Sequence, residues 1–231
     1  MGRASRGKAV KRLQRWASEK RFHTNNLIGL LQGASGMPED KLRELKVYVL
    51  QRLVSTVDHL RACKPGIERA QVMRLAVDTF LEAEGSNRNR QRVTCKAGCS
   101  HCCHINASAT EDEAETIAQA MADGLEVDLA LLERQAAYPD DCDFWWKASK
   151  VDTRCSFLKD GLCSIYAIRP AACRLHMSID DPAKCDKDNG RQDHLKFSCL
   201  NAEITLSAAM NVSKTGPIPK MVWAAIQRRK G

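Results

Sequence analysis

The distribution of cysteines is the feature that most constrains this chain. Four cysteines fall between Cys95 and Cys103, and four more lie between Cys155 and Cys185. Thiolate is a soft anionic ligand, and short spacings let several sulfurs reach one metal ion. The sequence therefore predicts a cysteine-built metal site with these candidate ligands: Cys95, Cys99, Cys102, Cys103, Cys155, Cys163, Cys173 and Cys185.

The total number of cysteines argues against a disulfide framework. The chain has eleven of them, an odd number, so complete internal pairing is impossible. The N-terminal segment has no apolar stretch typical of a secretory signal, and the chain has no run of about 20 apolar residues. We therefore expect a cytoplasmic protein without a membrane span, whose reduced thiols bind metal.

Positive charge is concentrated at the N-terminus. The formal net charge is +8, and residues 1–21 alone contribute +7, with Glu19 as their single acid. The basic residues are Arg3, Arg6, Lys8, Lys11, Arg12, Arg15, Lys20 and Arg21. We predict that residues 1–25 form a basic, disordered tail. The open alternatives are contact of residues 3–21 with nucleic acid or another acidic partner, and a mitochondrial transit peptide.

Two helices are predicted before the cysteine region. An acidic first turn follows Pro38, and apolar residues then recur every three or four positions, which predicts a helix over residues 39–62. A second apolar stripe predicts a helix over residues 70–84. We expect the two to form an antiparallel pair within a helical region of residues 26–87.

Residues 88–200 are predicted to form the cysteine-cluster domain. Thr110 and Glu113 make a capping box at the start of one helix, and residues 127–137 form another. The aromatic cluster Phe144-Trp145-Trp146 is interpreted as a core plug over the metal site. Pro170 begins a helix with Cys173 near its N-terminus, where we expect the helix dipole to lower the thiol pKa.

Residues 201–231 are predicted to be C-terminal helices, one over 202–211 and one through Trp223. The predicted fold class is mainly α, with a helical N-terminal region and a small cysteine-rich metal-binding module that contains one β-hairpin.

The hairpin lies within residues 155–166 and turns at Asp160-Gly161. A two-residue loop would pair Leu158 with Cys163 and place Cys155 and Cys163 on opposite faces. A three-residue loop would pair Phe157 with Cys163 and place both cysteines on one face. If both bind one metal site, the three-residue loop is expected.

The eight thiols suit two four-coordinate zinc sites or one four-iron cluster with cysteines to spare, and the sequence leaves both open. With sulfur in surplus, the neighbouring histidines are expected to donate hydrogen bonds around the site or to lie at the surface: His101, His104 and His176. The cysteines outside the pattern are expected to be small buried hydrophobes: Cys63, Cys142 and Cys199.

These motifs resemble the CxxCxxCC cysteine-cluster family, described as zinc- or iron-chelating. The resemblance covers roughly residues 88–190 and rests on the cysteine cluster, the hairpin with Asp160-Gly161, and Arg169-Pro170 followed by Cys173-Arg174. It implies that all eight candidate cysteines bind metal. The first spacing, Cys95-x3-Cys99, departs from the x2 of the family pattern.

The family domain also occurs in flagellin lysine N-methylases, and some members are labelled iron–sulfur oxidoreductases. Three functions follow as alternatives. The first is a metal-binding module, and the second is an enzyme of the iron–sulfur redox or protein lysine methyltransferase-like class. The third is a nucleic-acid-associated zinc protein that uses the basic N-terminus.

Overall fold

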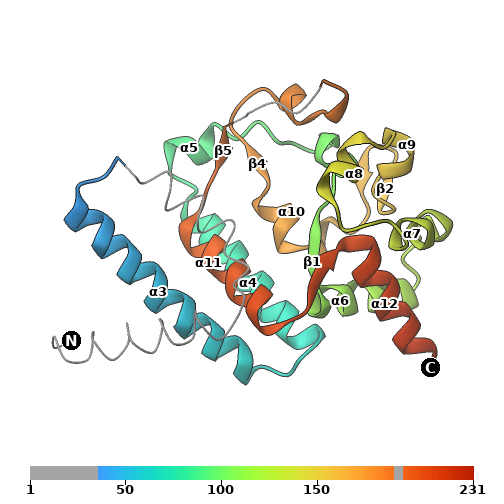
Figure 1. Ribbon diagram of the computed structural model, residues 1–231, viewed down its shortest axis with the longest axis horizontal. Coiled ribbons are helices and arrows are strands. Elements are labelled where there is room, and N and C mark those ends of the chain that lie inside the picture. The colour runs from blue at the N-terminus through green and yellow to red at the C-terminus, as the bar shows by residue number, and fades with distance from the viewer. Residues whose placement is uncertain (1–35, 190–194) are drawn as a thin grey trace.

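The computed structural model describes residues 36–189 and 195–231, and within them the chain is mainly helical with short antiparallel strand pairs (Figure 1), as predicted. The α-helices are α3 (Glu39–Ala62), α4 (Ile67–Ala83), α5 (Arg88–Gln91), α6 (Glu111–Ala122), α7 (Leu129–Ala136), α8 (Cys142–Lys147), α9 (Lys150–Thr153), α10 (Ala171–Leu175), α11 (Leu200–Val212) and α12 (Ile218–Lys230). The 3-10 helices are η1 (His101–His104), η2 (Tyr166–Ile168), η3 (Pro182–Cys185) and η4 (Lys187–Asn189). The strands are β1 (Ser108–Thr110), β2 (Leu158–Lys159), β3 (Leu162–Cys163), β4 (Met177–Ser178), β5 (Lys196–Phe197) and β6 (Thr215–Pro217).

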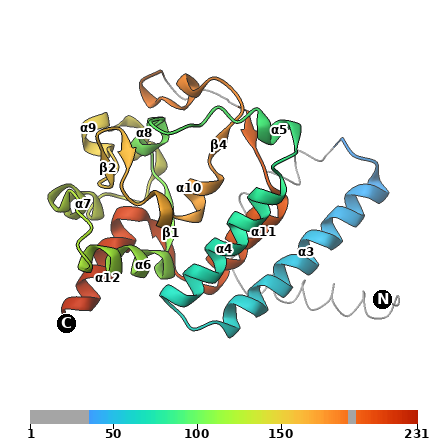
Figure 2. The same ribbon diagram turned by 180° about the vertical axis from the view of Figure 1, so that it is seen from behind.

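The helices α3, α4 and α11 form one layer of the molecule (Figures 1 and 2). The bounds of α3 agree with the prediction, and Gly66, with φ of 95°, turns the chain into α4. The two helices make little direct contact, however, because α11 packs against both. Buried residues such as Ile204 and Leu206 lie all round α11, so this helix needs neighbours on several sides. The predicted pair is thus part of a three-helix layer.

A second core lies between β1, α6, α7 and α12. Its fully buried members include Ile117, Leu132 and Val222. The strand β6 pairs with β1, with Ser108 opposite Pro217, so the C-terminal segment closes onto the start of α6. Of the three strand pairs among the described residues, β1–β6 and β4–β5 join segments separated in the sequence, and the hairpin β2–β3 is the one that was predicted.

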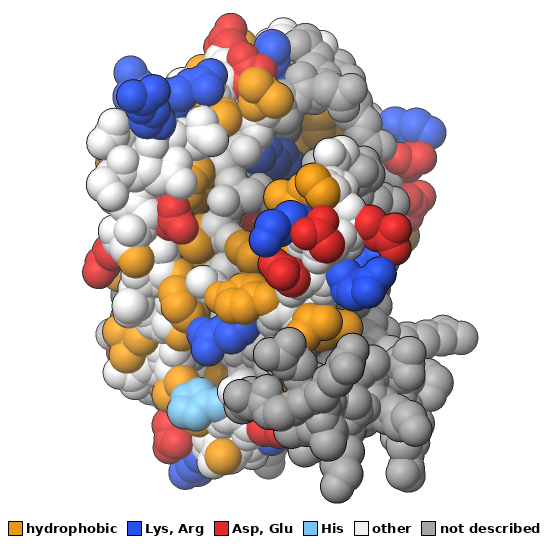
Figure 3. Space-filling view, turned by 90° about the vertical axis from the view of Figure 1, so that its left-hand side faces the viewer, with side chains coloured by type: hydrophobic (Ala, Val, Ile, Leu, Met, Phe, Trp, Pro, Cys, Tyr) orange, Lys and Arg blue, Asp and Glu red, His pale blue; other side chains and the backbone are white. Residues whose placement is uncertain are grey.

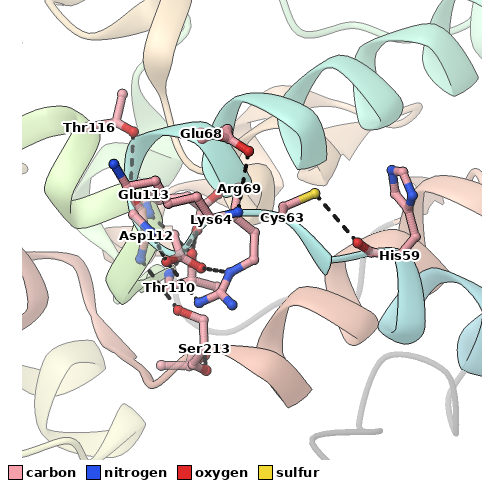
Figure 4. Close-up of polar contacts among 12 residues, drawn as sticks. His59, Cys63, Lys64, Glu68, Arg69, Thr110, Asp112, Glu113, Thr116 and Ser213 are labelled. Carbon is pink, nitrogen blue, oxygen red and sulfur yellow. Dashed lines mark hydrogen bonds and ion pairs between the residues drawn. The ribbon is translucent and has the colours of Figure 1, made fainter. Parts of the chain in front are cut away.

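The first turn of α6 ties the two cores together (Figure 4). The predicted capping box is present: the Thr110 amide donates to Glu113 Oε2 at 2.8 Å, and the Glu113 amide donates to Thr110 Oγ1. Asp112 accepts from Arg69 Nε at 2.6 Å and from the Gly66 amide at 2.6 Å. The Arg69 and Asp112 side chains are only 11% and 6% exposed, so this ion pair is a buried bridge between α4 and α6.

The basic residues 3–21, the candidate contact for nucleic acid, lie outside the described residues. On the described part of the face that carries α3, acidic, basic and hydrophobic side chains are interspersed (Figure 3). None of the helices in residues 36–189 and 195–231 combines the length and hydropathy needed to cross a bilayer.

Candidate metal centre

The first cysteine cluster lies on a loop and a short 3-10 helix, and the loop is anchored to β4. The Thr94 amide donates to the Ser178 carbonyl at 2.9 Å, and the Ser178 amide donates to the Cys95 sulfur at 3.3 Å. Gly98 then turns the chain with φ of 84°, a conformation that favours glycine, and η1 begins three residues later. The position of Cys95 is therefore fixed by a strand more than eighty residues away in sequence.

The hairpin has a two-residue loop, so the prediction of a three-residue loop is wrong. Leu158 pairs with Cys163, and φ is positive at both loop residues, 51° at Asp160 and 75° at Gly161. Such loops match the right-handed twist of the strands. Cys155 nevertheless reaches the same cavity as Cys163, because it precedes the strand in a turn closed by a hydrogen bond from the Leu158 amide to its carbonyl at 2.9 Å. The alternation of faces along the strand does not extend back to Cys155.

Helix α10 begins after Pro170, as predicted, and carries Cys173. Glu113 Oε1 accepts from the Ala171 amide at 2.7 Å, so the capping-box carboxylate of α6 also holds the start of α10. The expected lowering of the Cys173 pKa is wrong, because burial, and after it the charges of neighbouring thiolates, raise this pKa. A helix of five residues has too small a dipole to offset that burial.

One cavity of about 550 Å³ gathers most of the predicted ligands in the described part of the chain. Its wall includes Cys95, Cys99, Cys102, Cys103, Cys155, Cys163 and Cys173. Cys185, 7% exposed, is buried beside it. The pKa of Cys185 is raised first by burial and then by the charges of Cys102, Cys95 and Cys99.

Four sulfurs form a mutually neighbouring group, the inner set, made of Cys102, Cys155, Cys163 and Cys173. Burial first, and then the charges of Cys163 and Cys102, raise the pKa of Cys155 to about 11. The pKa of Cys173 is raised by burial and then by the charges of the other three. The pKa of Cys163 is raised by burial, with a further contribution from Cys102. All six pairs in the inner set are thus close enough for their charges to repel.

A second group, the outer set, consists of Cys95, Cys99 and Cys185. Burial raises the pKa of Cys99, and the charges of Cys95 and then Cys102 add to it. The contribution of Cys102 to both Cys99 and Cys185 places the outer set next to the inner set. The adjacent Cys103 thiol is the largest cause of the raised pKa of Cys102, followed by burial.

The donor chemistry of this cavity fits a metal. Thiolates that repel one another are stabilised by a cation, and sulfur ligands select zinc or iron–sulfur clusters. No three His, Cys, Asp or Glu side chains of residues 36–189 and 195–231 converge closely enough to hold a single ion. The seven sulfurs on this wall therefore surround a cavity rather than a point.

The histidines make contacts around this region. His101 Nδ1 lies 3.2 Å from Asp186 Oδ2, and His104 Nδ1 lies 3.1 Å from the Lys150 carbonyl oxygen. His176 lines the cavity. The first two contacts agree with the predicted role of hydrogen-bonding groups around the site.

The cysteines outside the pattern differ from one another. Cys199 is 4% exposed in the first core, as predicted, whereas Cys63 is only partly buried and its sulfur lies 3.4 Å from the His59 carbonyl oxygen. The side chain of Cys142 lies outside the described part of the structure. Of the predicted plug Phe144-Trp145-Trp146, Trp145 is 3% exposed and lines the cavity, whereas Phe144 and Trp146 are partly buried and are not part of its wall.

Polar side chains that the sequence did not place in the cavity wall include Asn106, Gln135 and Ser156. Arg169, which also lines the cavity, entered the prediction as part of the Arg169-Pro170 motif and without a role of its own. No spacing or composition signal in the sequence places Asn106, Gln135 or Ser156 in the cavity.

Comparison with known proteins gives one match. Residues 94–199 match the family CxxCxxCC, described as "Putative zinc- or iron-chelating domain". This match confirms the resemblance drawn from the cysteines and the hairpin, and it agrees with the predicted cofactor, zinc or iron–sulfur. No curated protein and no solved structure matches the chain.

Proposed function

Since residues 94–199 match the CxxCxxCC family, we propose that this chain is a metal-binding protein that holds zinc or an iron–sulfur cluster through its cysteine cavity. The observation that carries the proposal is the cavity itself, with seven of the eight predicted ligands on its wall. A random distribution of buried thiols would not place sulfurs from the η1 region, the hairpin and α10 around one space.

The inner set is the proposed primary centre. Its sulfurs come from η1, the turn before β2, the strand β3 and helix α10, so one metal would cross-link four segments of the domain. Without metal, ionisation of one thiol opposes ionisation of the others. Bound metal supplies the compensating positive charge and, for an iron–sulfur cluster, the capacity for one-electron transfer.

The outer set is the proposed second group of ligands. It either completes a second zinc site together with a further donor or remains available beside an iron–sulfur cluster. Cys103 follows Cys102 directly in the chain and lies on the same cavity wall, so it is the candidate for that further donor.

Metal analysis of anaerobically purified protein tests the proposal. A brown preparation with iron and sulfide identifies a cluster, and a colourless one with zinc identifies zinc sites. Cys173→Ser should lower the metal content by at least one site. The matched control, Cys199→Ser, removes a thiol that is also buried but lies in the other core, and should keep full metal content.

Two further outcomes are informative. If Cys185→Ser and Cys173→Ser each lose half of the zinc, the two sets hold separate ions. Protein that purifies without metal and takes up neither zinc nor an iron–sulfur cluster on anaerobic reconstitution would refute the proposed function.

A further inference from the structure

The helix α10, which carries Cys173, is too short to hold its own position. It has five residues, and isolated helices of this length are not stable in water. The place of the Cys173 sulfur therefore depends on the contacts that hold α10 against the rest of the fold. Cys173 belongs to the inner set, so the groups that orient α10 also orient a proposed metal ligand.

Arg174, the next residue of α10, anchors this helix in two directions. Its side chain reaches back to the preceding turn, where Nε donates to the Arg169 carbonyl at 3.1 Å and Nη2 donates to the Ala167 carbonyl. It also reaches across to α4, where Nη1 lies 2.8 and 3.1 Å from the two carboxylate oxygens of Asp78. Arg174 is buried and Asp78 is half-buried, so solvent screens this ion pair less than one at the open surface.

Polar contacts join α4, α6 and α10 in a closed ring. Asp112, at the start of α6, accepts from Arg69 of α4 at 2.6 Å (Figure 4). Its neighbour Glu113 accepts from the Ala171 amide of α10 at 2.7 Å. The ion pair made by Asp78 joins α10 back to a different turn of α4. Each of the three helices is thus held by the other two, and Cys173 lies on the shortest of them.

We propose that Asp78 is a positioning residue of the metal centre and acts through Arg174 to set the place of the Cys173 sulfur. An ion pair suits this role because charge-assisted hydrogen bonds are short and strong. The helix α4 then belongs to the metal-binding unit, although it precedes residues 94–199, which match the family. The inference deepens the proposed function and rests on it, because it assigns a role in metal binding to a carboxylate of α4.

Titration of the metal-free protein with cobalt(II) tests this inference, because thiolate–cobalt bonds absorb light and their number sets the intensity. Asp78→Asn keeps the shape of the side chain and removes its charge. We expect this variant to bind cobalt at least ten-fold more weakly, the lower end of the loss of about 10–100-fold that follows replacement of groups that orient metal ligands. The thiolate-to-cobalt absorption per bound ion should also fall, because Cys173 is the displaced sulfur.

Two controls separate positioning from stability and from charge. Val49→Ala removes buried methyl groups from α3, which takes no part in the ring of contacts, so it should lower stability and leave cobalt binding unchanged. Glu82→Gln removes an exposed carboxylate of α4 and should also bind cobalt normally. Circular dichroism first establishes that each metal-free variant is folded.

A double variant assigns the effect to the ion pair. Arg174→Met breaks the same link from the other side, so adding Asp78→Asn to it should weaken cobalt binding no further. If Arg174→Met does not fold, Asp78→Asn decides alone, because its half-buried side chain makes it the milder change.

Three results would overturn the inference and leave the ion pair with a role in stability alone. These are unchanged cobalt affinity in Asp78→Asn, an equal loss of affinity in Val49→Ala, and losses that add in the double variant. Wild-type protein that binds neither cobalt, nor zinc, nor an iron–sulfur cluster refutes the proposed function instead.

Discussion

Replacing Asp112 by Asn removes the counterion of a buried arginine, and the structure provides a comparison that isolates the effect of burial. The closest N–O distance is 2.6 Å both in the Arg69–Asp112 pair and in the Lys159–Glu126 pair. The side chains of the first pair are 11% and 6% exposed, and those of the second are 65% and 80% exposed. If distance alone decided the strength of an ion pair, breaking either pair would lower the free energy of unfolding equally. Burial instead predicts a much larger loss for the Arg69–Asp112 pair than for the Lys159–Glu126 pair.

Removing one partner of a buried ion pair costs about 3–5 kcal/mol. The amide oxygen of the substituted side chain would still accept from the Gly66 amide, so we expect the lower end, about 3 kcal/mol. For a chain of 231 residues, each kcal/mol shifts Tm by about 2–4 °C, which gives a decrease of roughly 6–12 °C for Asp112→Asn.

Urea and thermal unfolding of metal-loaded protein, followed by circular dichroism, measure this loss. Glu126→Gln is the control and should leave the unfolding curve unchanged, because an exposed ion pair adds little to stability. A loss below about 1 kcal/mol for Asp112→Asn, or equal losses for the two variants, would refute the reasoning from burial.

Three further predictions concern the domain around the cavity. Gly161→Val places a β-branched side chain at φ of 75° and should cost about 1–3 kcal/mol in urea unfolding, while Leu162→Val in the same hairpin should cost less; equal costs would show that backbone strain is not the cause. Glu113→Ala removes the anchor of α10 and should weaken metal affinity about 10–100-fold in competition with a chelator, whereas Glu115→Ala should not; unchanged affinity would contradict the role of the anchor. Burial is the largest cause that raises the pKa of Cys155 from 9.0 to about 11, so the unfolded chain loses this proton first, and this thiol alone should cost the metal-free protein about 2–3 kcal/mol as the pH rises from about 9 to about 11. The raised pKa values of Cys102 and Cys173 add to that loss. Urea unfolding at a series of pH values measures this loss, which metal-loaded protein should not show; a flat profile for the metal-free protein would contradict it.

The sequence predicted local features well. The bounds of α3 and the capping box at Thr110 depend on residues within a few positions of one another, so local chemistry decides them. The cysteine spacing also predicted which thiols gather at the cavity.

Features that depend on distant contacts were not predictable. The Cys155 amide donates to the Cys103 carbonyl at 2.7 Å, and this hydrogen bond holds Cys155 outside the hairpin strand. No local pattern in the sequence predicts this contact. It also does not show that α11 packs between helices formed more than a hundred residues earlier. The Cys173 pKa was predicted in the wrong direction because the helix start is visible in the sequence and the burial of the thiol is not.

The strand β6 positions the part of the cavity wall that is synthesised after the candidate ligands. Ile218 and Pro219 line the cavity directly after β6, and the Ile218 amide donates to the Ala107 carbonyl at 2.9 Å. The ribosome makes these two residues after all eight candidate ligands. This part of the cavity wall therefore comes from residues more than thirty positions beyond the last candidate ligand, and pairing of β6 with β1 brings it into place.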